Sequence, residues 1–319
     1  MKLKEKILEL LERCQGEFIS GEEMAKQTGV TRNSVWKAIK SLKSDGYDIV
    51  SSGVGYALTV ENDIFTASKI KSFLKNDVDV ILLDTADSSN NIAKQIAREE
   101  APEGTVVVVK RQSAGKGRLG RTFISNEENG LYMSIILRPR ISASKSVKIT
   151  VVGAVAALEA IEETSSIPCT IKWVNDIFIN GKKACGILTE ASFNMESGLL
   201  DYVVLGIGVN VLPPENGFDE EINNIATSIY ANKAPRNYKS KLCASIIDKV
   251  LEYYRNLENE AYIAIYRSKS NLIGKEVIIV RGNEEINGKV IDIDNDAMLV
   301  LETENGILKF NSGEARIKK

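Results

Sequence analysis

The amino-acid sequence predicts an α+β protein of three domains: a winged helix-turn-helix over residues 1–62, a mixed sheet packed with helices over 63–271, and a small β-barrel over 272–319. Three observations support this prediction. Helical apolar spacing and a tight glycine turn occur in the first region, strand-like and helix-like segments alternate in the second, and short strands with turn dipeptides fill the third. At roughly 100 to 200 residues per domain, 319 residues allow two or three domains.

Composition narrows the class of protein. The chain is 44% hydrophobic and 26% charged, which is ordinary for a soluble globular protein. Acidic residues interrupt the apolar ones in the N-terminal stretch MKLKEKILELLERC, and no later run approaches the roughly 18 apolar residues of a membrane span. We therefore expect a cytoplasmic protein that makes no membrane contact.

The residue types available for chemistry are also restricted. The sequence contains no histidine, which excludes imidazole-based triads and H-E-x-x-H zinc sites. Catalysis must therefore use Lys, Arg, Asp, Glu, the backbone or a metal ion. The cysteines are far apart and form no C-x-x-C pair, so we expect reduced, mostly buried thiols at Cys14, Cys169, Cys185 and Cys243.

The first region has the element order of a winged helix-turn-helix. Apolar residues recur at helical spacing at the start of the chain, and the capping box Ser20-Gly-Glu-Glu23 begins a second helix that Gly29 ends. Thr31 caps a third helix that ends at Gly46, and two short strands follow around residues 53–55. Helix, helix, tight turn, helix and hairpin in this order are typical of a winged helix.

The third helix predicts DNA contacts. It carries no acidic residue between Arg32 and Ser44, which suits phosphate contacts from a helix in the major groove. Residues 1–60 hold nine Lys and Arg against eight Asp and Glu, so the alternative is a solvated helix face on a protein-interaction winged helix. Because one helix offers few contacts, DNA binding would require a dimer. The residues that we expect to contact DNA are Arg32, Asn33, Ser34, Lys37 and Lys40.

The central region alternates between strand-like and helix-like segments. Helices are expected over residues 89–100 and 143–164 and between 239 and 266. A hairpin signal at Asn180-Gly181 indicates a largely antiparallel sheet with helices packed on it. The expected strands are VDVILLD (78–84), TVVVV (105–109), LYMSIILRP (131–139), TIKWVNDIFI (170–179), KKACGILTEASF (182–193) and YVVLGIGVNV (202–211).

The third region consists of short strands after Gly274. Fewer than fifty residues hold EVIIVRG, INGKVIDIDND, AMLVLETENG and ILKFNSGEARI, separated by turn dipeptides. This pattern predicts a small β-barrel at the end of the sequence.

The stretch GKGRLGRT, residues 115–122, fits two nucleotide-binding templates, G-x-G-x-x-G and a near match to a Walker A loop. The first template needs a strand running into the first glycine and a helix at the last, but residues 110–114 intervene and a strand follows. The second needs that helix too, and a lysine where Arg121 stands. Both templates fail. We predict a glycine-hinged, positively charged loop that closes on a ligand, and the alternative is a flexible basic surface loop.

The segment KWVNDIFINGKKACGILTE predicts a charged sheet surface. A two-residue turn at Asn180-Gly181 aligns Asp176 with Cys185. Strand alternation then places Lys172, Asp176 and Lys183 on one face. The alternative is an ordinary solvated face.

Two weaker segments accompany these. In DTADSSNN, residues 84–91, Ser88 or Ser89 can serve a ligand or act as a plain helix N-cap. In LGIGVNV, residues 205–211, Gly206 and Gly208 allow a strand to approach a ligand closely, and Asn210 is a candidate for a metal or phosphate.

In this order, the segments resemble the biotin protein ligase family, and the winged helix points to its bifunctional ligase and biotin operon repressor members. The resemblance covers nearly the whole chain. Its most specific elements are GKGRLGR (115–121), which is similar to the family's G-R-G-R-x-x-R loop, and KWVND (172–176) followed by GIL (186–188). Lys116 stands where the family most often has Arg, and Phe123 where it often has Trp, which alters the grip on the adenylate and the stacking on adenine.

The resemblance implies a catalytic domain related to class II aminoacyl-tRNA synthetases and an SH3-like C-terminal barrel. It implies biotin, ATP and Mg²⁺ as ligands, with biotinyl-5'-AMP formed first and biotin then transferred to a lysine of a biotin carboxyl carrier protein. Operator DNA is the second implied partner, bound by a homodimer when adenylate is present. A lipoate-type ligase and a biotin-sensing repressor without catalysis remain as alternatives.

Roles for individual residues follow from the same resemblance. The ureido ring of biotin would be held by Ser88, Ser89, Asn90 and Gln112. The biotin carboxylate and the adenylate phosphate would be lined by Lys116, Gly117 and Arg118, and Lys183 would bind the carboxylate and the acyl phosphate. ATP, Mg²⁺ and the incoming lysine would be bound by Lys172, Asn175, Asp176 and Asn210. The implied ligand-binding set also includes Gly115, Arg121, Phe123 and Gly186. The implied catalytic residues are Lys183, Arg118, Asp176 and Lys172, and the implied metal ligands are Asp176 and Asn210. Acyl-adenylate formation requires placed charges and no imidazole, so a chain without histidine can perform it.

Overall fold

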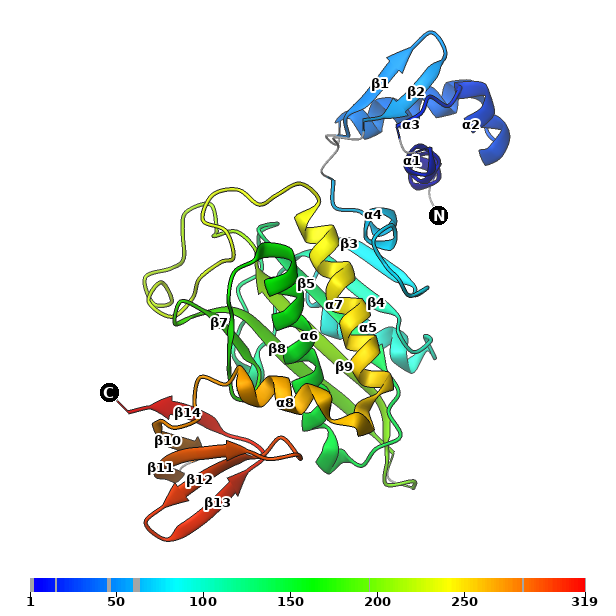
Figure 1. Ribbon diagram of the computed structural model, residues 1–319. Coiled ribbons are helices and arrows are strands. Elements are labelled where there is room, and N and C mark those ends of the chain that lie inside the picture. Colours follow the sequence, from blue (N-terminus) through cyan, green and yellow to red (C-terminus); the bar gives the residue numbers. More distant parts are fainter. Residues whose placement is uncertain are drawn as a thin grey trace. The chain divides into compact units, whose positions relative to one another are not determined.

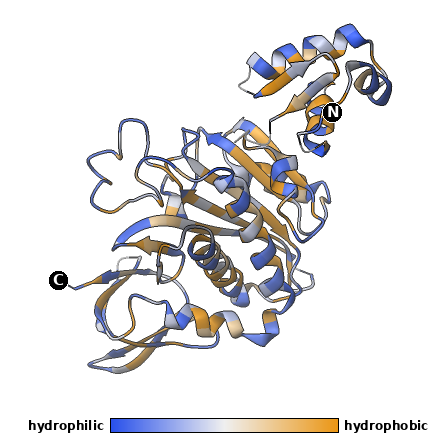
Figure 2. Ribbon diagram, turned by 45° about the horizontal axis from the view of Figure 1, so that its top comes forward, coloured by the Kyte–Doolittle hydropathy of each residue, from blue (hydrophilic) through white to orange (hydrophobic). Residues whose placement is uncertain are grey.

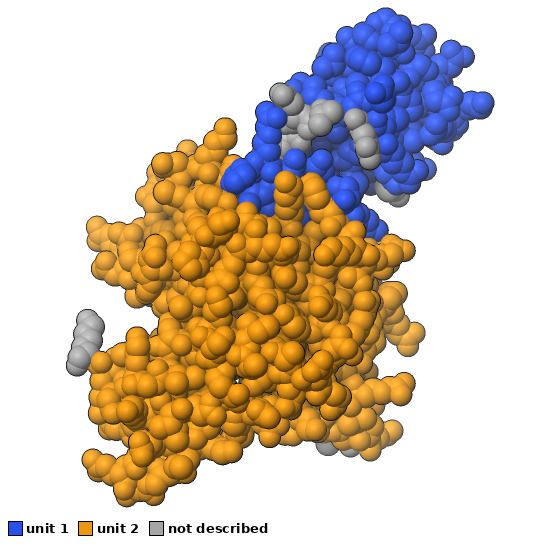
Figure 3. All heavy atoms as spheres, in the orientation of Figure 1, with its two compact units in different colours: residues 1–72, 235–240 blue, residues 73–234, 241–319 orange. Residues whose placement is uncertain are grey.

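The computed structural model describes residues 3–14, 16–44, 47–59, 64–194, 196–282 and 284–318. The chain forms two compact units (Figure 3): unit 1 is residues 1–72 with 235–240, and unit 2 is residues 73–234 with 241–319. The predicted boundary between residues 62 and 63 lies outside the described residues, as does the predicted helix end at Gly46. Within the described ranges, none of the helices combines the length and apolar character that crossing a membrane requires.

Unit 1 has the predicted helix and hairpin order (Figure 1). Its elements are α1 (Leu3–Arg13), α2 (Gly21–Thr28), α3 (Arg32–Ser44), β1 (Ile49–Ser52), β2 (Gly55–Leu58) and α4 (Ala67–Lys71). The Ser20 side chain accepts a hydrogen bond from the backbone N–H of Glu23, and Gly29 ends α2 in the left-handed conformation, as predicted. Ile7, Leu11, Met24 and other buried residues of the three helices form the core.

Unit 2 contains a seven-stranded sheet in the order β3-β4-β5-β9-β8-β7-β6. Among its described strands, only β3 and β4 pair in parallel, so the prediction of a largely antiparallel sheet is confirmed. The strands are β3 (Val80–Ala86), β4 (Val106–Gln112), β5 (Gly130–Leu137), β6 (Thr170–Lys172), β7 (Asp176–Ile179), β8 (Lys182–Phe193) and β9 (Leu200–Asn210).

Helices cover both faces of this sheet. They are α5 (Ser89–Arg98), α6 (Val147–Ser165), α7 (Tyr238–Arg255) and α8 (Ala261–Ser268), with short 3-10 turns at Arg118–Gly120, Ala143–Lys145 and Leu257–Asn259. On β9, Val204 packs in a cluster with α5, whereas its neighbour Leu205 lies against Gly153 of α6, so the two helices lie on opposite faces. Figure 2 shows the apolar residues concentrated along these strands and α6.

The segment TIKWVNDIFI is not the single strand that we predicted. It forms two short strands, β6 and β7, which pair with each other and place Lys172 opposite Asp176. At this reversal the Trp173 indole donates to the carbonyl of Ala297 (3.1 Å) and the Tyr266 hydroxyl donates to the carbonyl of Val174 (2.9 Å). Both partners are distant in sequence, so local alternation could not reveal the turn.

The predicted register of the β7–β8 hairpin is also wrong in part. Phe178 pairs with Lys183, as a two-residue turn requires. A bulge between Ile177 and Phe178 then shifts the pairing, so that Asp176 lies opposite Gly186 instead of Cys185. The predicted shared face of Lys172, Asp176 and Lys183 therefore rested on a wrong strand geometry.

Residues beyond Gly274 form a five-stranded antiparallel sheet in the order β13-β12-β11-β10-β14. Its strands are β10 (Glu276–Arg281), β11 (Glu284–Ile293), β12 (Leu299–Thr303), β13 (Gly306–Phe310) and β14 (Glu314–Ile317). Across the described residues, the strand order leaves β13 and β14 as edges. The β-rich C-terminal region is therefore confirmed, and the closed barrel is not.

Candidate active site

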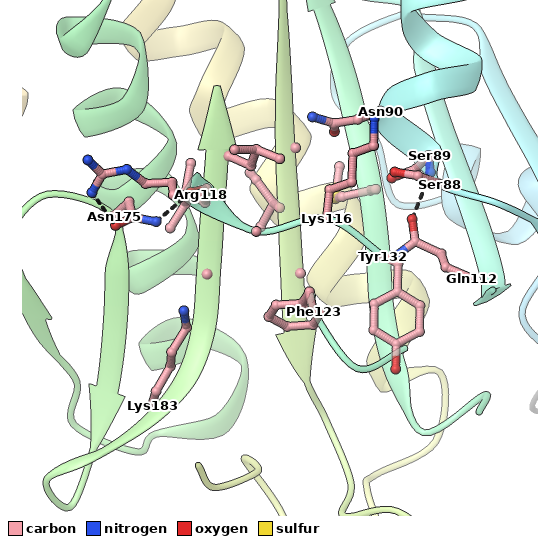
Figure 4. Close-up of a pocket in the computed structure, with 18 residues that line it drawn as sticks. Ser88, Ser89, Asn90, Gln112, Lys116, Arg118, Phe123, Tyr132, Asn175 and Lys183 are labelled. Atoms are coloured by element: carbon pink, nitrogen blue, oxygen red, sulfur yellow. Dashed lines mark hydrogen bonds between the residues drawn. The ribbon is translucent and has the colours of Figure 1, made fainter. Parts of the chain in front are cut away.

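Two joined cavities lie on the sheet of unit 2. The inner cavity is narrow, about 50 Å³, and the outer cavity is wide, about 550 Å³. Figure 4 shows Ser88, Ser89 and Gln112 together on one side of the inner cavity, and Arg118, Asn175 and Lys183 on the other. The residues that line both cavities, and so mark their junction, are Gly117, Arg118, Phe123, Asn175 and Lys183.

The structure brings nearly all of the sequence-predicted ligand residues to these cavities. Ser88, Ser89, Asn90, Gln112, Lys116 and Gly186 line the inner cavity together with the junction residues. Arg121, Lys172, Asp176 and Asn210 line the outer cavity. Gly115 lines neither: a Cβ at that position would collide with Ser125 and the Phe123 carbonyl, so this glycine allows the loop to pack closely.

The side of the inner cavity that is lined by Ser88, Ser89 and Gln112 carries neutral polar groups, and hydrogen bonds hold them in place. The backbone N–H of Ser89 donates to Gln112 Oε1 (2.7 Å), and Gln112 Nε2 donates to Ser125 Oγ (3.0 Å). Ser88 stands at the N-cap position of α5, but its side chain makes no capping hydrogen bond. The expected N-cap position of Ser88 is therefore confirmed, but its hydroxyl does not serve the helix as a capping acceptor.

Glycines on β8 and β9 let side chains of this protein lie flat on the sheet. A Cβ on Gly208 would stand 2.8 Å from the Phe123 ring, and a Cβ on Gly206 would collide with the Asn90 amide. The close approach predicted for Gly206 and Gly208 is therefore present, but the groups that approach are Asn90 and Phe123. These two side chains form the floor of the inner cavity beside Gly186.

The basic loop of residues 115–122 is a closed, strand-flanked turn. Lys116 and Thr122 form an antiparallel bridge, and the Gly117 N–H donates to the Arg121 carbonyl (2.7 Å). Leu119, at its tip, adopts a positive φ of 56° and is 79% exposed. The chain continues into β5 rather than a helix, which excludes both nucleotide-binding templates.

Three cations of this loop contact three different parts of unit 2. Lys116 Nζ donates to Asn91 Oδ1 (2.6 Å), and Arg118 Nη1 donates to Asn175 Oδ1 (3.1 Å). Arg121 forms an ion pair with Glu314 of the C-terminal sheet (2.5 Å). Burial lowers the pKa of the Arg118 guanidinium, and the nearby Asp176 carboxylate offsets part of this by raising it. An arginine still keeps its charge at neutral pH.

A lysine and a carboxylate meet in the outer cavity. Lys183 Nζ lies 2.7 Å from Asp176 Oδ1, an ion-pair distance without the angles of a hydrogen bond. The backbone of Lys183 is held by Ile225 and Thr227, and Asn210 Nδ2 donates to the Thr227 carbonyl (3.0 Å). The loop that carries Thr227 therefore fixes the position of both strands at this cavity.

Sequence reasoning missed several lining residues. Tyr132 packs edge-on against Phe123, with ring centroids 6.2 Å apart, and donates its hydroxyl to Asn129 (3.0 Å). Strand alternation in LYMSIIL could have indicated its direction. Gly313 and Glu314 line the outer cavity from the C-terminal sheet, and no local signal marks them, because their contact depends on packing between distant segments.

The predicted DNA-contacting residues lie together on α3 in unit 1. Arg32, Asn33, Lys37 and Lys40 are exposed, whereas Ser34 is half-buried and its backbone N–H donates to the capping Thr31 hydroxyl (3.2 Å). Trp36 lies among them with 49% of its surface exposed, and Lys40 Nζ lies 5.4 Å from its ring centroid.

Comparison with known proteins defines the class of protein to which this fold and site belong. Residues 82–210 match the biotin/lipoate A/B protein ligase family, residues 4–57 match an HTH domain, and residues 272–316 match the biotin protein ligase C terminal domain. The chain is similar to the biotin protein ligase of Aquifex aeolicus solved in complex with biotin and ATP: TM-score 0.63, 28% identity, covering 76% of this chain and 99% of that one.

Two similar relatives match nearly the full length of the chain. The bifunctional ligase/repressor BirA of Bacillus subtilis (strain 168) is 35% identical over 99% of this chain and 98% of its own length. BirA of Escherichia coli (strain K12) is 26% identical over 98% and 96%, respectively. The chain belongs to the family of these bifunctional ligase/repressor proteins.

Proposed function

We propose that this protein is an ATP-dependent biotin protein ligase that forms biotinyl-5'-AMP and transfers biotin to a lysine of a biotin carboxyl carrier protein, and that it represses a biotin operon. The observation that carries the proposal is the junction of the two cavities, where Arg118 and Lys183 line both. Joining a carboxylate to an α-phosphate brings two anions to one point, and cations placed there neutralise their repulsion.

The inner cavity is proposed to hold biotin. Its buried hydroxyl and amide groups, from Ser88, Ser89, Asn90 and Gln112, suit the N–H and C=O groups of a ureido ring. Lys116, Gly117 and Arg118 would then face the carboxylate and the adenylate phosphate, with Lys183 on the same group. Phe123 would stack on adenine. Gly186, which lines the inner cavity, would give the ligand backbone clearance, and Gly115 would act by letting the loop pack closely against Ser125 and Phe123.

The outer cavity is proposed to hold ATP with Mg²⁺, using Lys172, Asn175, Asp176, Asn210 and Arg121. The donor set fits magnesium, which takes one or two protein carboxylates and completes its shell with phosphates and water. Asp176 would supply a carboxylate. The amide oxygen of Asn210 would be available to the metal ion, because its amide nitrogen donates to the Thr227 carbonyl. Within the described ranges, no group of three or more His, Cys, Asp and Glu side chains could hold a metal, which fits an ion carried by the nucleotide.

Asp176 is proposed to orient or deprotonate the acceptor lysine in the second step. In this role it would leave its contact with Lys183, which then binds the acyl phosphate. We expect Asp176→Asn to slow biotin transfer from preformed adenylate by about 100-fold, because general base catalysis is typically worth at least that factor. Single-turnover transfer to a carrier domain measures this step, and a near-normal rate would rule the role out.

The N-terminal unit is proposed to bind operator DNA through α3, with Arg32, Asn33, Ser34, Lys37 and Lys40 at the contact. A single short helix offers few contacts, so we propose a homodimer that forms when adenylate is bound. Sedimentation with biotin and ATP should then detect the dimer, and a monomer at every concentration would contradict it. A cytoplasmic location belongs to the same proposal.

Two finer features of the fold are proposed on the family resemblance alone. The sheet of unit 2 would be related to class II aminoacyl-tRNA synthetases, and the C-terminal sheet would be SH3-like. We also propose that the chain divides into three domains, residues 1–62, 63–271 and 272–319.

The experiment that tests the enzymatic proposal is mass spectrometry of a biotin carrier domain after incubation with the protein, biotin and MgATP. We expect one added biotinyl group on a lysine. A biotin-sensing repressor without catalysis would leave the carrier unmodified. A lipoate-type ligase would instead release pyrophosphate from ATP with lipoate and not with biotin.

A further inference from the structure

Trp36 is an exposed aromatic residue on the helix that carries the proposed DNA contacts. Successive helix residues are rotated by about 100°, so residues four apart follow one another along the helix surface. Arg32, Trp36 and Lys40 therefore form one exposed row on α3, and Trp36 stands in its middle with 49% of its surface exposed. The buried side chains of α3 form a separate stripe, which consists of Val35, Ala38, Ile39 and Leu42.

A cavity lies beside Trp36. Its volume is about 270 Å³, and it is bounded by the start of α2, by α3 and by the turn between β1 and β2. Lys43 Nζ donates to Ser51 Oγ (2.9 Å), which ties this hairpin to α3 (Figure 1). Val54, in the turn, also lines the cavity and is 68% exposed. The indole therefore borders an open surface with a second apolar side chain on it.

The core of unit 1 does not account for this tryptophan. Among the described residues, Trp36 belongs neither to the core cluster of unit 1 nor to the side chains packed against that cluster. Lys40 Nζ lies 5.4 Å from the ring centroid, at a cation–π distance. An indole has one of the largest apolar surfaces of any side chain, so its burial is strongly favourable. Trp36 can gain that burial only from a partner.

The charges around the ring favour DNA as this partner over a second copy of the chain. Arg32, Lys37 and Lys40 are exposed, and no acidic residue occurs between Arg32 and Ser44. Two copies that met through this face would bring like charges together, whereas a polyanion is attracted to them. Glu22 also lines the cavity, so its carboxylate disfavours a phosphate there. The cavity side of Trp36 is therefore left to a base.

We propose that Trp36 reads a thymine: its ring packs against the methyl group that thymine presents in the major groove, while Lys37 and Lys40 contact the neighbouring phosphates. Among the bases of DNA only thymine carries a methyl group there, and an apolar ring suits it. The inference rests on the proposed DNA binding and deepens it. Cations on phosphates position a protein without reading sequence, whereas Trp36 adds a contact that depends on the base.

The test first selects a duplex. A pool of duplexes with a randomised centre is selected for binding to the full chain with biotin and MgATP, and the thymines of the selected site are then replaced by deoxyuridine one at a time. Deoxyuridine lacks only the methyl group, so base pairing and the polar edge of the base are unchanged. We expect at least one replacement to weaken binding about 3- to 5-fold, the value of burying one methyl group.

Trp36→Ala should abolish this discrimination. The thymine duplex should bind the variant about 10- to 30-fold more weakly, and the sensitive deoxyuridine duplex should bind it equally well, because both contacts are then the same. Thermal unfolding checks that the variant is folded. The salt dependence of binding should stay as in the original chain, since no phosphate contact is lost.

Two further variants are the controls. Lys37→Gln should weaken binding to both duplexes alike and lower the slope of log affinity against log salt by about 1, while it keeps the preference for thymine. Phe18→Ala removes another exposed aromatic side chain of unit 1, which is 44% exposed and does not line the cavity. This variant should bind the selected duplex within about 2-fold of the original chain.

Fluorescence quenching gives a readout that needs no variant. The chain has two tryptophans, and Trp173 is only 3% exposed, so acrylamide should quench mainly Trp36 in the free chain. The selected duplex should shield Trp36 from acrylamide. Shielding that appears without DNA as the chain concentration rises would identify a second copy as the occupant and overturn the inference.

The remaining outcomes also separate this inference from the proposed function. Full quenching of Trp36 in the DNA-bound chain, a site in which no deoxyuridine replacement weakens binding, or a thymine preference that survives in Trp36→Ala would each overturn the inference. A chain that selects no duplex from the pool would instead overturn the proposed repression.

Discussion

At Gly208, a single missing Cβ decides where an aromatic ring lies. The Phe123 ring rests on the backbone of β9 at this point and meets Tyr132 edge-on. Any side chain at position 208 would occupy the place of the ring. The aromatic floor of the cavity therefore depends on a residue with no side chain of its own.

Gly208→Ala is expected to destabilise the fold by about 1 to 3 kcal/mol, because its Cβ would lie 2.8 Å from the ring and overpack the site. In a Phe123→Ala background the same substitution should cost clearly less, since the clash is gone. Urea unfolding of the four chains measures this coupling. Equal costs in both backgrounds would show that the ring is not what the glycine accommodates.

At the scale of elements, the β6–β7 turn places Asn175 at the junction of the two cavities and Asp176 in the outer cavity. Its backbone is held from outside, since Tyr266 of α8 donates to Val174 and Trp173 donates to Ala297. Burial raises the pKa of the Tyr266 hydroxyl well above its usual value, so it remains a donor throughout the neutral range. Helix α8 is thereby tied to the site although it contributes no lining side chain.

Tyr266→Phe is expected to lower stability by about 1 to 2 kcal/mol and to slow pyrophosphate release, because the Val174 carbonyl loses its donor inside the protein. Tyr262→Phe is the matched control: it removes a hydroxyl on the same helix that donates to the Leu257 carbonyl (3.3 Å). Both variants should lose some stability, but only Tyr266→Phe should reduce the rate of adenylation. An equal loss of activity in both would contradict the positioning role of Tyr266.

At the scale of the whole molecule, the packed core protects the thiols. Cys169, Cys185 and Cys243 are buried, and Cys14 is only partly so. Burial raises the pKa of Cys169 to about 12 and that of the other two buried thiols higher still, so all three stay protonated and unreactive at pH 8.

Iodoacetamide at pH 8 should therefore modify the native protein at Cys14 alone, as mass spectrometry of its peptides can show. The same reaction in denaturant should modify all four cysteines. Rapid native labelling of Cys243 would mean that α7 separates from the sheet.

Local signals predicted much of this molecule. The Ser20 cap, the Gly29 terminus and the Asn180-Gly181 turn depend on neighbours within a few residues, so they could be identified from sequence. The segments that form the cavities were also identified. The β6–β7 reversal was missed because the groups that hold its backbone, Tyr266 and Ala297, lie about a hundred residues away.

The sequence by itself determined the types of element, the winged-helix order and the set of polar and basic residues available for chemistry, because periodicity, caps and glycines act over short distances. Only the tertiary structure decided that the cavity residues meet, that the Asp176 register shifts by a bulge, and that the Asn90 amide donates to Glu190. These features depend on which distant atoms share a buried volume, and burial is what makes each of their hydrogen bonds directional.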